Sequence, residues 1–277
     1  MGKLYVVGTP IGNLGDFSPR AAETLSAVDF IAAEDTRVTA KLLNHFGIKR
    51  PMVIYQKFNE REQGEAIVAR LLAGESCAVV TDAGMPCISD PGETLVSLCA
   101  GAGIPIEAVP GPSALVTALA VSGLSVSRFT FEGFLSVKHS SRMEHLHSLI
   151  HEHRTMVFYE APHKLLSTLR DMYAVLGDKD VVLVRELTKI HESVWRGTLS
   201  EAVAYHEANP PKGEYVLILG GMPEEESPDP LEDAVALARK LTEEENMPLS
   251  AAAREAAKLS GCAKGEIYQA LLAERKE

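Results

Sequence analysis

The chain has 277 residues, 46% of them hydrophobic and 23% charged, which suits a globular protein of two domains better than one small domain. Its formal net charge of −11 argues against a nucleic-acid-binding surface spread over the whole protein. No apolar run approaches the roughly 18–20 residues that span a bilayer, and the N-terminus lacks a signal-peptide profile, so we expect a cytoplasmic protein with no membrane partner.

In the first half of the chain, short apolar runs alternate with amphipathic stretches. The expected strands are Leu4–Val7, Phe30–Ala33, Met52–Tyr55, Ser76–Thr81 and Ile104–Val109. The expected helices are Pro19–Ala27, Val38–Phe46, Glu60–Leu72 and Thr94–Ala100. This alternation, with short links, predicts a parallel sheet covered by helices on both faces. In such sheets, ligands bind beyond the carboxyl ends of the strands.

Glycine- and proline-rich turns follow the first, fourth and fifth expected strands. Gly8–Gly15 is neither a GxGxxG nor a P-loop, and an ordinary βα turn is its alternative reading. Thr81–Gly92 contains two Asp, two Gly and two Pro, so this rigid loop suits a ligand with an amino-acid end and a ribose. Pro110–Ser113 opens a helix whose N-terminal N–H groups favour a carboxylate.

The second half alternates less regularly. The expected helices are Ser113–Leu124, Ser140–His153 and Lys164–Leu176. The expected strands are Phe129–Leu135, Thr155–Tyr159, Val181–Arg185, Val194–Thr198 and Tyr215–Leu219, of which the last two could pair as antiparallel neighbours. We therefore expect an N-terminal α/β domain over residues 1–117 and a second α/β domain over residues 118–222.

A different composition begins after residue 222. Glu224–Asp233 is acidic and proline-rich, as in a linker. Three short helical patterns follow it, Leu231–Leu241, Leu249–Leu259 and Lys264–Ala273. The last two loosely resemble a helix-turn-helix, and a small helical cap is the alternative. We expect residues 223–277 to be an acidic linker with a helical tail that supports RNA contact, and we expect no DNA partner.

Several motifs together resemble one known family. They are GTPIGNLGD (8–16), AEDTR (33–37), TDAGMPCISDPG (81–92), VPGPS (109–113), FYEAPH (158–163) and RELTKIHE (185–192). The chain resembles the tetrapyrrole methylase superfamily, the class III methyltransferases that use S-adenosylmethionine (SAM), over roughly residues 3–221. Within it, the chain is most similar to the small-subunit ribosomal RNA methyltransferase I group. Met85 departs from the superfamily, since many members have Asp there.

The resemblance implies a fold, a cofactor and a substrate. The fold is two α/β domains with a SAM cleft between them and a small C-terminal helical appendage. The activity is transfer of a methyl group to the ribose 2′-OH of a cytidine in the decoding region of 16S rRNA within the 30S subunit, by a homodimer. By position, the residues that line the SAM site are Pro10, Asp82, Gly84, Ile88, Ser113, Ala114, Tyr159, Glu160, Leu187 and Thr188. Either Asp82 or Asp90 faces the cofactor ribose.

A ribose hydroxyl must lose its proton during methylation, so a general base would help. The candidate bases are Glu34, Asp35, Glu160, Glu186 and His191. Arg37, Glu186 and Lys189 are expected to be needed for turnover more than for folding. Arg37, Arg185 and Lys189 could hold RNA phosphates or lower the pKa of the acceptor. Both charged clusters could instead be structural ion pairs.

The histidines between His139 and His153 suggest a metal site only weakly. His147 and His151 lie four apart and could share a ligand, but no Cys or acidic cluster completes a set, so we expect no metal. With Lys138, Arg142 and Arg154 nearby, a solvated surface that faces RNA is the better interpretation. The four cysteines form no CxxC pair and are expected to be reduced.

Two alternative functions fit the same sequence. One is a C-methyltransferase that acts on a tetrapyrrole precursor, which would share the fold and the cofactor. The other is a SAM-binding regulator without turnover. The charged strand ends in both domains favour an enzyme over the regulator.

Overall fold

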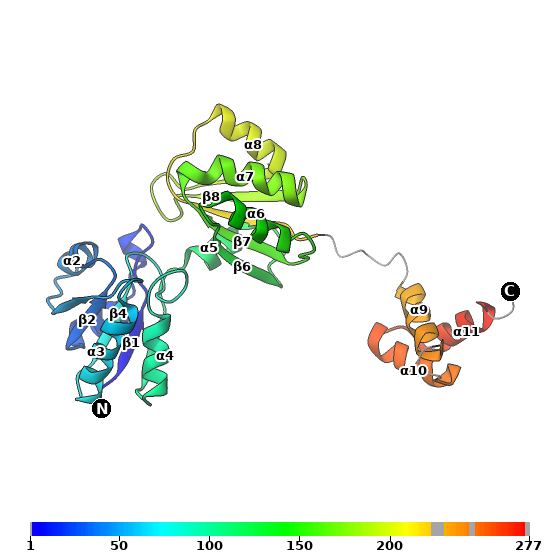
Figure 1. The fold of residues 1–277 in the computed structure, drawn as a ribbon, viewed down its shortest axis with the longest axis horizontal. Coiled ribbons are helices and arrows are strands. Elements are labelled where there is room, and N and C mark those ends of the chain that lie inside the picture. The colour runs from blue at the N-terminus through cyan, green and yellow to red at the C-terminus, as the bar shows by residue number, and fades with distance from the viewer. Residues whose placement is uncertain (1, 223–229, 244–246, 275–277) are drawn as a thin grey trace. The chain divides into compact units, whose positions relative to one another are not determined.

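The computed structural model describes residues 2–222, 230–243 and 247–274. The chain divides into two compact units, residues 1–222 and 223–277 (Figure 1). Within the described residues no helix is long and apolar enough to cross a membrane. The larger unit contains two five-stranded sheets.

The first sheet is all parallel, with strand order β3-β2-β4-β1-β5. Its strands are β1 (Leu4–Val7), β2 (Phe30–Ala33), β3 (Met52–Ile54), β4 (Cys77–Val80) and β5 (Ile106–Val109). The 3-10 turn η1 (Leu14–Asp16) and the helices α1 (Pro19–Ala27), α2 (Thr36–His45), α3 (Glu60–Leu72) and α4 (Glu93–Gly101) connect them. The predicted parallel sheet is confirmed, with boundaries moved by a few residues at most.

Two apolar layers hold the first sheet between its helices. Leu25 of α1 and Leu43 of α2 are buried on one face of the sheet. Leu71 of α3 and Leu95 of α4 are buried on the other. Every residue of β4 is buried, which explains its unbroken apolar sequence. Local signals set the helix starts: Ser18, for example, caps α1 by accepting a hydrogen bond from the Ala21 N–H.

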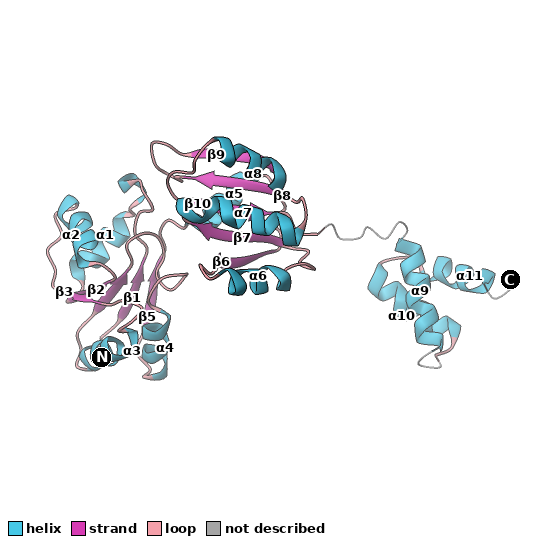
Figure 2. Cartoon of the chain, turned by 45° about the horizontal axis from the view of Figure 1, so that its top comes forward, coloured by secondary structure: helices cyan, strands magenta, loops and turns pink. Residues whose placement is uncertain are grey.

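The second sheet is mixed, with strand order β6-β7-β10-β8-β9 (Figure 2). Its strands are β6 (Phe129–Phe134), β7 (Thr155–Glu160), β8 (Asp180–Arg185), β9 (Ser193–Thr198) and β10 (Tyr215–Leu219). Only β6 and β7 run parallel to each other, and the other neighbours are antiparallel. The expected pairing of Val194–Thr198 with Tyr215–Leu219 is wrong. Strand β9 pairs with β8, and β10 lies between β7 and β8.

Helices cover the second sheet on both faces. One face packs against α6 (His139–Ser148), α7 (Pro162–Leu176) and α8 (Leu199–Ala208), the last of which the sequence analysis did not predict. The other face packs against α5 (Ala114–Ser122) through Ala118 and Leu119. The predicted domain boundary at residue 117 falls inside α5. Because this helix packs on the second sheet, the part of the chain that belongs to that sheet begins at Ala114.

The smaller unit contains α9 (Pro230–Glu243), α10 (Leu249–Ser260) and α11 (Lys264–Glu274). Ala238, Ala253, Ile267 and Leu271 are among the residues that form its core. The predicted linker reached Asp233, but α9 already begins at Pro230. Residues 223–229 of that linker lie outside the described residues.

Candidate active site

The three glycine-rich turns meet at the carboxyl edge of the first sheet, because β4, β1 and β5 are neighbours. Thr9 and Gly84 exchange backbone hydrogen bonds of 2.9 and 3.2 Å, which ties the turn after β1 to the turn after β4. Gly8 and Gly111 face each other so closely that a Cβ on Gly8 would lie 2.7 Å from the Gly111 Cα. Any side chain at either position would push the turns apart.

These turns form one wall of a cavity of about 380 Å³, and strand ends of the second sheet form the other wall. Such a volume lies within the roughly 300–1,000 Å³ that is usual for small-molecule sites. The wall is made by Ile11, Ala83, Gly84, Met85, Ile88, Ser89, Asp90, Ser113, Ala114, Phe134, Tyr159, Glu160, Ala161, Val184, Leu187, Lys189, Glu214, Tyr215 and Val216. We call it the central cavity.

Seven of the ten residues predicted to line the SAM site lie on this wall: Gly84, Ile88, Ser113, Ala114, Tyr159, Glu160 and Leu187. The other three, Pro10, Asp82 and Thr188, do not, although each is next in sequence to a residue that does. Asp82 is exposed and its Oδ1 accepts a hydrogen bond of 3.1 Å from the Asp35 N–H. Of the two candidate aspartates, Asp90 is therefore the one that faces the cavity.

Two loops on the wall hold residues in the left-handed backbone region. Cys87 and Ser89 flank Ile88 with φ of 74° and 67°, and Glu186 and Thr188 flank Leu187 with φ of 51° and 67°. Such conformations cost energy in non-glycine residues and gather at binding sites. Among the described residues, these four are the only non-glycine residues with positive φ. This places local strain on both sides of the central cavity.

The N-terminus of α5 also opens on the cavity. Ser113 and Ala114 lie on the wall, and the Ser113 side chain makes no capping hydrogen bond to the helix. The Leu115 N–H donates to the Tyr159 hydroxyl over 3.0 Å. Phe134 lies against the Tyr159 ring in an edge contact at 5.5 Å. An aromatic wall beside a helix N-terminus suits a ligand that has both a flat ring and a carboxylate.

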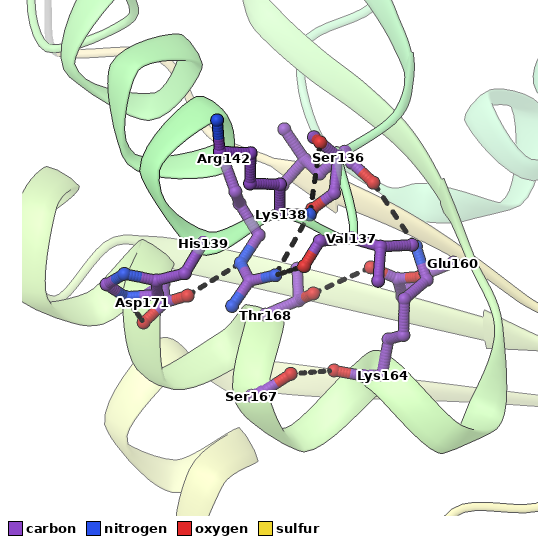
Figure 3. Close-up of polar contacts among 11 residues, drawn as sticks. Ser136, Val137, Lys138, His139, Arg142, Glu160, Lys164, Ser167, Thr168 and Asp171 are labelled. Carbon is purple, nitrogen blue, oxygen red and sulfur yellow. Dashed lines mark hydrogen bonds and ion pairs between the residues drawn. The ribbon is translucent and has the colours of Figure 1, made fainter.

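Glu160, a predicted base and cofactor contact, is already engaged by three donors of the protein itself (Figure 3). Its carboxylate accepts from the Lys164 ammonium over 2.8 Å, from the Ala161 N–H over 2.8 Å and from the Thr168 hydroxyl over 2.6 Å. The side chain is 1% exposed. These contacts make Glu160 a buried structural anion at the end of β7, and they argue against its use as the base.

The carboxylates after β2 and β4 form a second group. The Asp82 N–H donates to Glu34 Oε2 over 3.2 Å. Burial raises the pKa of Glu34 and of Asp82, whereas the Arg37 guanidinium lowers the pKa of Asp35 to about 2. Burial, with the charges of Glu34 and Asp82, raises the pKa of Asp90 to about 6. Asp90 makes no hydrogen bond to any described residue, so its carboxylate is available to a ligand.

Arg37 lies apart from the central cavity. Its side chain is 87% exposed and forms an ion pair with Asp35 at 2.6 Å. Glu34 and Asp35 are also absent from the wall. The charged end of β2 therefore reaches the cavity only indirectly, through the electrostatic effect of Glu34 on Asp90.

The charged end of β8 does reach the cavity. Lys189 Nζ lies on the wall, 2.9 Å from Glu186 Oε1 and 2.6 Å from Glu214 Oε2. Burial would lower the pKa of Lys189, but these two carboxylates outweigh it and raise the pKa. The Glu214 N–H and the Lys189 ammonium lower the pKa of Glu186. His191 is exposed and does not line the cavity.

The histidine-rich segment differs from its prediction. Helix α6 ends at Ser148, so His147 and His151 do not share a helix. Arg142 is buried and donates to Asp171 over 2.6 Å, as Figure 3 shows, and it does not form a solvated surface that faces RNA. Arg154 pairs with Glu152 at 2.7 Å. In the parts of the chain that the structure describes, no three metal-ligating side chains gather.

Sequence reasoning missed several wall residues, among them Val184, Glu214 and Val216. Val184 and Val216 point away from the core that Leu183 and Leu217 join on the opposite face of the sheet. Strand periodicity could have identified this cavity-facing side. No local pattern identifies Glu214, because its place on the wall depends on the pairing of β10 with β8.

Comparisons with known proteins agree with this geometry. Residues 3–203 match the family described as "Tetrapyrrole (Corrin/Porphyrin) Methylases", and residues 228–276 match the "RsmI C-terminal HTH domain". The second match supports the loosely predicted helix-turn-helix in the tail.

Two curated relatives carry the same description, "Ribosomal RNA small subunit methyltransferase I". The protein of Synechocystis sp. is 47% identical over 270 residues, which cover 97% of each chain. The protein of Thermotoga maritima is 49% identical over 221 residues, which cover 80% of this chain and 99% of that relative. The Thermotoga relative therefore has no counterpart for about a fifth of this chain.

Solved structures share the fold at low sequence identity. Uroporphyrin-III C-methyltransferase from Thermus thermophilus, complexed with S-adenosylhomocysteine, has a TM-score of 0.55 at 19% identity and covers 79% of this chain and 97% of its own. The cobalt precorrin-4 methyltransferase CbiF has a TM-score of 0.57 at 20% identity, with coverages of 79% and 94%.

Proposed function

The chain belongs to the tetrapyrrole methylase family and, within it, to the ribosomal RNA small subunit methyltransferase I group; on that premise we propose that it methylates the ribose 2′-OH of a cytidine in the decoding region of 16S rRNA. The observation that carries this proposal is the central cavity. There a free carboxylate, Asp90, shares a wall with a fixed cation, Lys189, and with an aromatic surface.

The cavity residues fit SAM as the methyl donor. The open N-terminus of α5 at Ser113 and Ala114 suits the methionine carboxylate, and Tyr159 with Leu187 offers apolar surface to the adenine. When bound, SAM supplies an activated methyl group on its sulfonium. The protein must then align the acceptor and manage its proton.

Asp90 is the general base in this proposal. Of the three carboxylates on the wall, Glu160 accepts from three donors of the protein and Glu214 is paired with Lys189, whereas Asp90 makes no hydrogen bond within the described chain. A pKa of about 6 leaves it ionised near neutral pH and still able to accept a proton from a hydroxyl. It replaces the five bases proposed from sequence, since none of these combines a place on the wall with a free carboxylate.

Lys189 positions the acceptor. Its ammonium is held by two carboxylates and stays charged, so it offers a fixed positive charge beside the reacting hydroxyl or its neighbouring phosphate. Glu186 orients Lys189 and is a positioning residue. Arg37 would contact RNA phosphates outside the cavity.

The proposed substrate is the folded 30S subunit, and the proposed acting form is a cytoplasmic homodimer. A dimer would join two weakly basic surfaces into one larger RNA-binding face, so RNA would be held locally although each chain carries a net charge of −11.

The test uses the purified full chain, labelled SAM and 30S subunits from cells that lack the enzyme. We expect label on a single cytidine ribose in the decoding region. Label on a base, or no label on RNA, would contradict the proposal. Uroporphyrinogen serves as the control acceptor, because methylation of it would support the tetrapyrrole alternative. Tight SAM binding with no acceptor methylated would support the regulator.

A further inference from the structure

A second cavity of about 390 Å³ lies on the other face of the second sheet from the central one. Its wall is formed by Leu183, Arg185, Ser193, Trp195, Tyr205, His206, Asn209, Pro210, Lys212 and Tyr215. We call it the aromatic cavity. Tyr215 lines both cavities, so the two are neighbours across the second sheet. None of the residues assigned above to SAM or to proton transfer lines the aromatic cavity.

The aromatic side chains of this wall are packed against one another. The rings of Trp195 and Tyr205 lie 5.9 Å apart at 31°, and His206 contacts both Tyr205 and Tyr215 edge-on. His206 and Tyr215 are buried, whereas Tyr205 is 44% exposed. Burial lowers the pKa of His206, so it is a neutral ring near pH 7. Tyr205 and the half-buried Trp195 therefore offer uncharged π surface to a ligand, and the buried rings of His206 and Tyr215 support them.

Two cations and no acidic side chain complete the wall. The Arg185 Nε–H donates to the Lys212 carbonyl oxygen over 2.8 Å, which fixes the guanidinium at the cavity. In the described part of the chain, the terminal amino groups of Arg185 and the Lys212 ammonium form no hydrogen bond or ion pair. These two cations therefore remain available to an anionic ligand at the cavity.

Stacking surfaces beside free cations are how proteins bind unpaired nucleotides, with a base on the ring and a phosphate on the cation. We propose that the aromatic cavity binds one unpaired nucleotide of the RNA that carries the acceptor. This inference rests on the proposed function for its RNA. It adds a second contact point that would fix which nucleotide reaches Asp90 and Lys189.

Trp195 provides a direct readout, because it is the single tryptophan of the chain. A short single-stranded RNA is titrated into the full chain while the tryptophan fluorescence is recorded, and inorganic phosphate is the anion-only control. We expect RNA to quench the emission saturably and phosphate alone to have no such effect. Equal quenching by phosphate, or none by RNA, would overturn the nucleotide site.

Substitutions that keep the fluorophore locate the contacts. Because Arg185→Gln removes a charged hydrogen-bond donor to phosphate, it should raise the RNA Kd about tenfold or more and lower the salt slope by about one. Lys212→Gln should act in the same direction. Tyr205→Leu removes a stacking surface and should raise the Kd about fivefold or more.

Arg61→Gln is the matched control, since Arg61 is an exposed cation of α3 with its side chain 88% exposed, away from the aromatic cavity. If Arg185→Gln shifts the RNA Kd no more than Arg61→Gln does, the inference is wrong. Calorimetric SAM binding by Lys212→Gln should match the wild type, which shows that the fold is intact.

The failures of the two proposals can be told apart. Ribose methylation of 30S subunits with no RNA effect on Trp195 would refute only the aromatic site. Quenching by RNA without any RNA methylation would refute only the proposed reaction.

Discussion

The ends of β2 and β8 carry similar charged sequences, but only the end of β8 reaches the central cavity. Glu34–Arg37 follows β2, which lies beside β4 and is separated by it from β1 and β5. Lys189 follows β8 and lies on the cavity wall, held by Glu186 and Glu214. A charged strand end thus indicates a site only when strand order places it beside the ligand loops. Substitutions at the strand ends test this difference.

The largest effect is expected where the wall offers its free carboxylate. Asp90→Asn cannot accept a proton, so kcat should fall by about 10²–10⁴-fold, the usual contribution of a general base. Steady-state kinetics with 30S subunits measures the loss, and SAM binding by calorimetry is the control. A large increase in SAM Kd with unchanged kcat would instead assign Asp90 to the cofactor ribose.

The pH dependence follows from the same group. The pKa of Asp90 is raised from 3.8 to about 6, so the wild-type rate should rise with pH through about 6 and then level off. The raised pKa has the opposite effect on stability: its contribution is full below pH 3.8 and is lost as pH rises through about 6. Asp90→Asn should therefore be no less stable than the wild type at pH 7. Thermal unfolding of both proteins at pH 7 measures this.

Glu160 lies at a third strand end, that of β7, and there we expect a substitution to lower folding stability rather than activity. Removing the charge in Glu160→Gln leaves the Lys164 ammonium, whose side chain is 14% exposed, without its ion-pair partner. Breaking a buried pair in this way costs about 3–5 kcal/mol. Denaturant unfolding measures this loss, and Arg170→Gln, which breaks an exposed ion pair, is the control. Unchanged stability with a large loss of kcat would make Glu160 catalytic after all.

Much of this architecture could be predicted from sequence because the signals are local. Strand–helix alternation predicts the first sheet, and the composition of the turns after β1, β4 and β5 predicts a ligand site at its carboxyl edge. What could not be predicted depends on strand order. Nothing local says that β10 inserts between β7 and β8, and so the pairing of β9 with β10 was wrong and Glu214 was missed.

The choice between Asp82 and Asp90 shows the same limit at one loop. Both aspartates lie in the turn after β4, eight residues apart, with equivalent chemistry. Their roles separate only because the end of β2 lies alongside, where the Asp35 N–H engages the Asp82 carboxylate. The second cavity was equally hidden, since its aromatic residues come from β9, α8 and β10.

Lys189→Met removes the cation at the end of β8 and replaces it with an uncharged side chain of similar length. A hydrogen-bonded charge in a cavity is worth roughly 1.5–3 kcal/mol, so activity should fall about 10–100-fold. Glu186→Gln should give a smaller loss, because Glu214 still holds Lys189. Single-turnover methylation of 30S subunits measures both variants. A wild-type rate for Lys189→Met would show that Lys189 does not contribute to methyl transfer, although it lies on the cavity wall.

Arg37→Gln should have the smallest effect, because its guanidinium is exposed and paired only with Asp35 at the end of β2. We expect an unchanged kcat and an increase of about threefold in KM for 30S subunits, with the salt slope reduced by about one if a phosphate contact is lost. Neither Arg37 nor Asp35 is among the charges that raise the pKa of Asp90, so the pH–rate profile should not move. A loss of kcat as large as that of Lys189→Met would mean that the β2 end reaches the reacting atoms. The distinction between the two strand ends would then fail, and a closed arrangement of the two sheets would be required to bring Arg37 to the substrate.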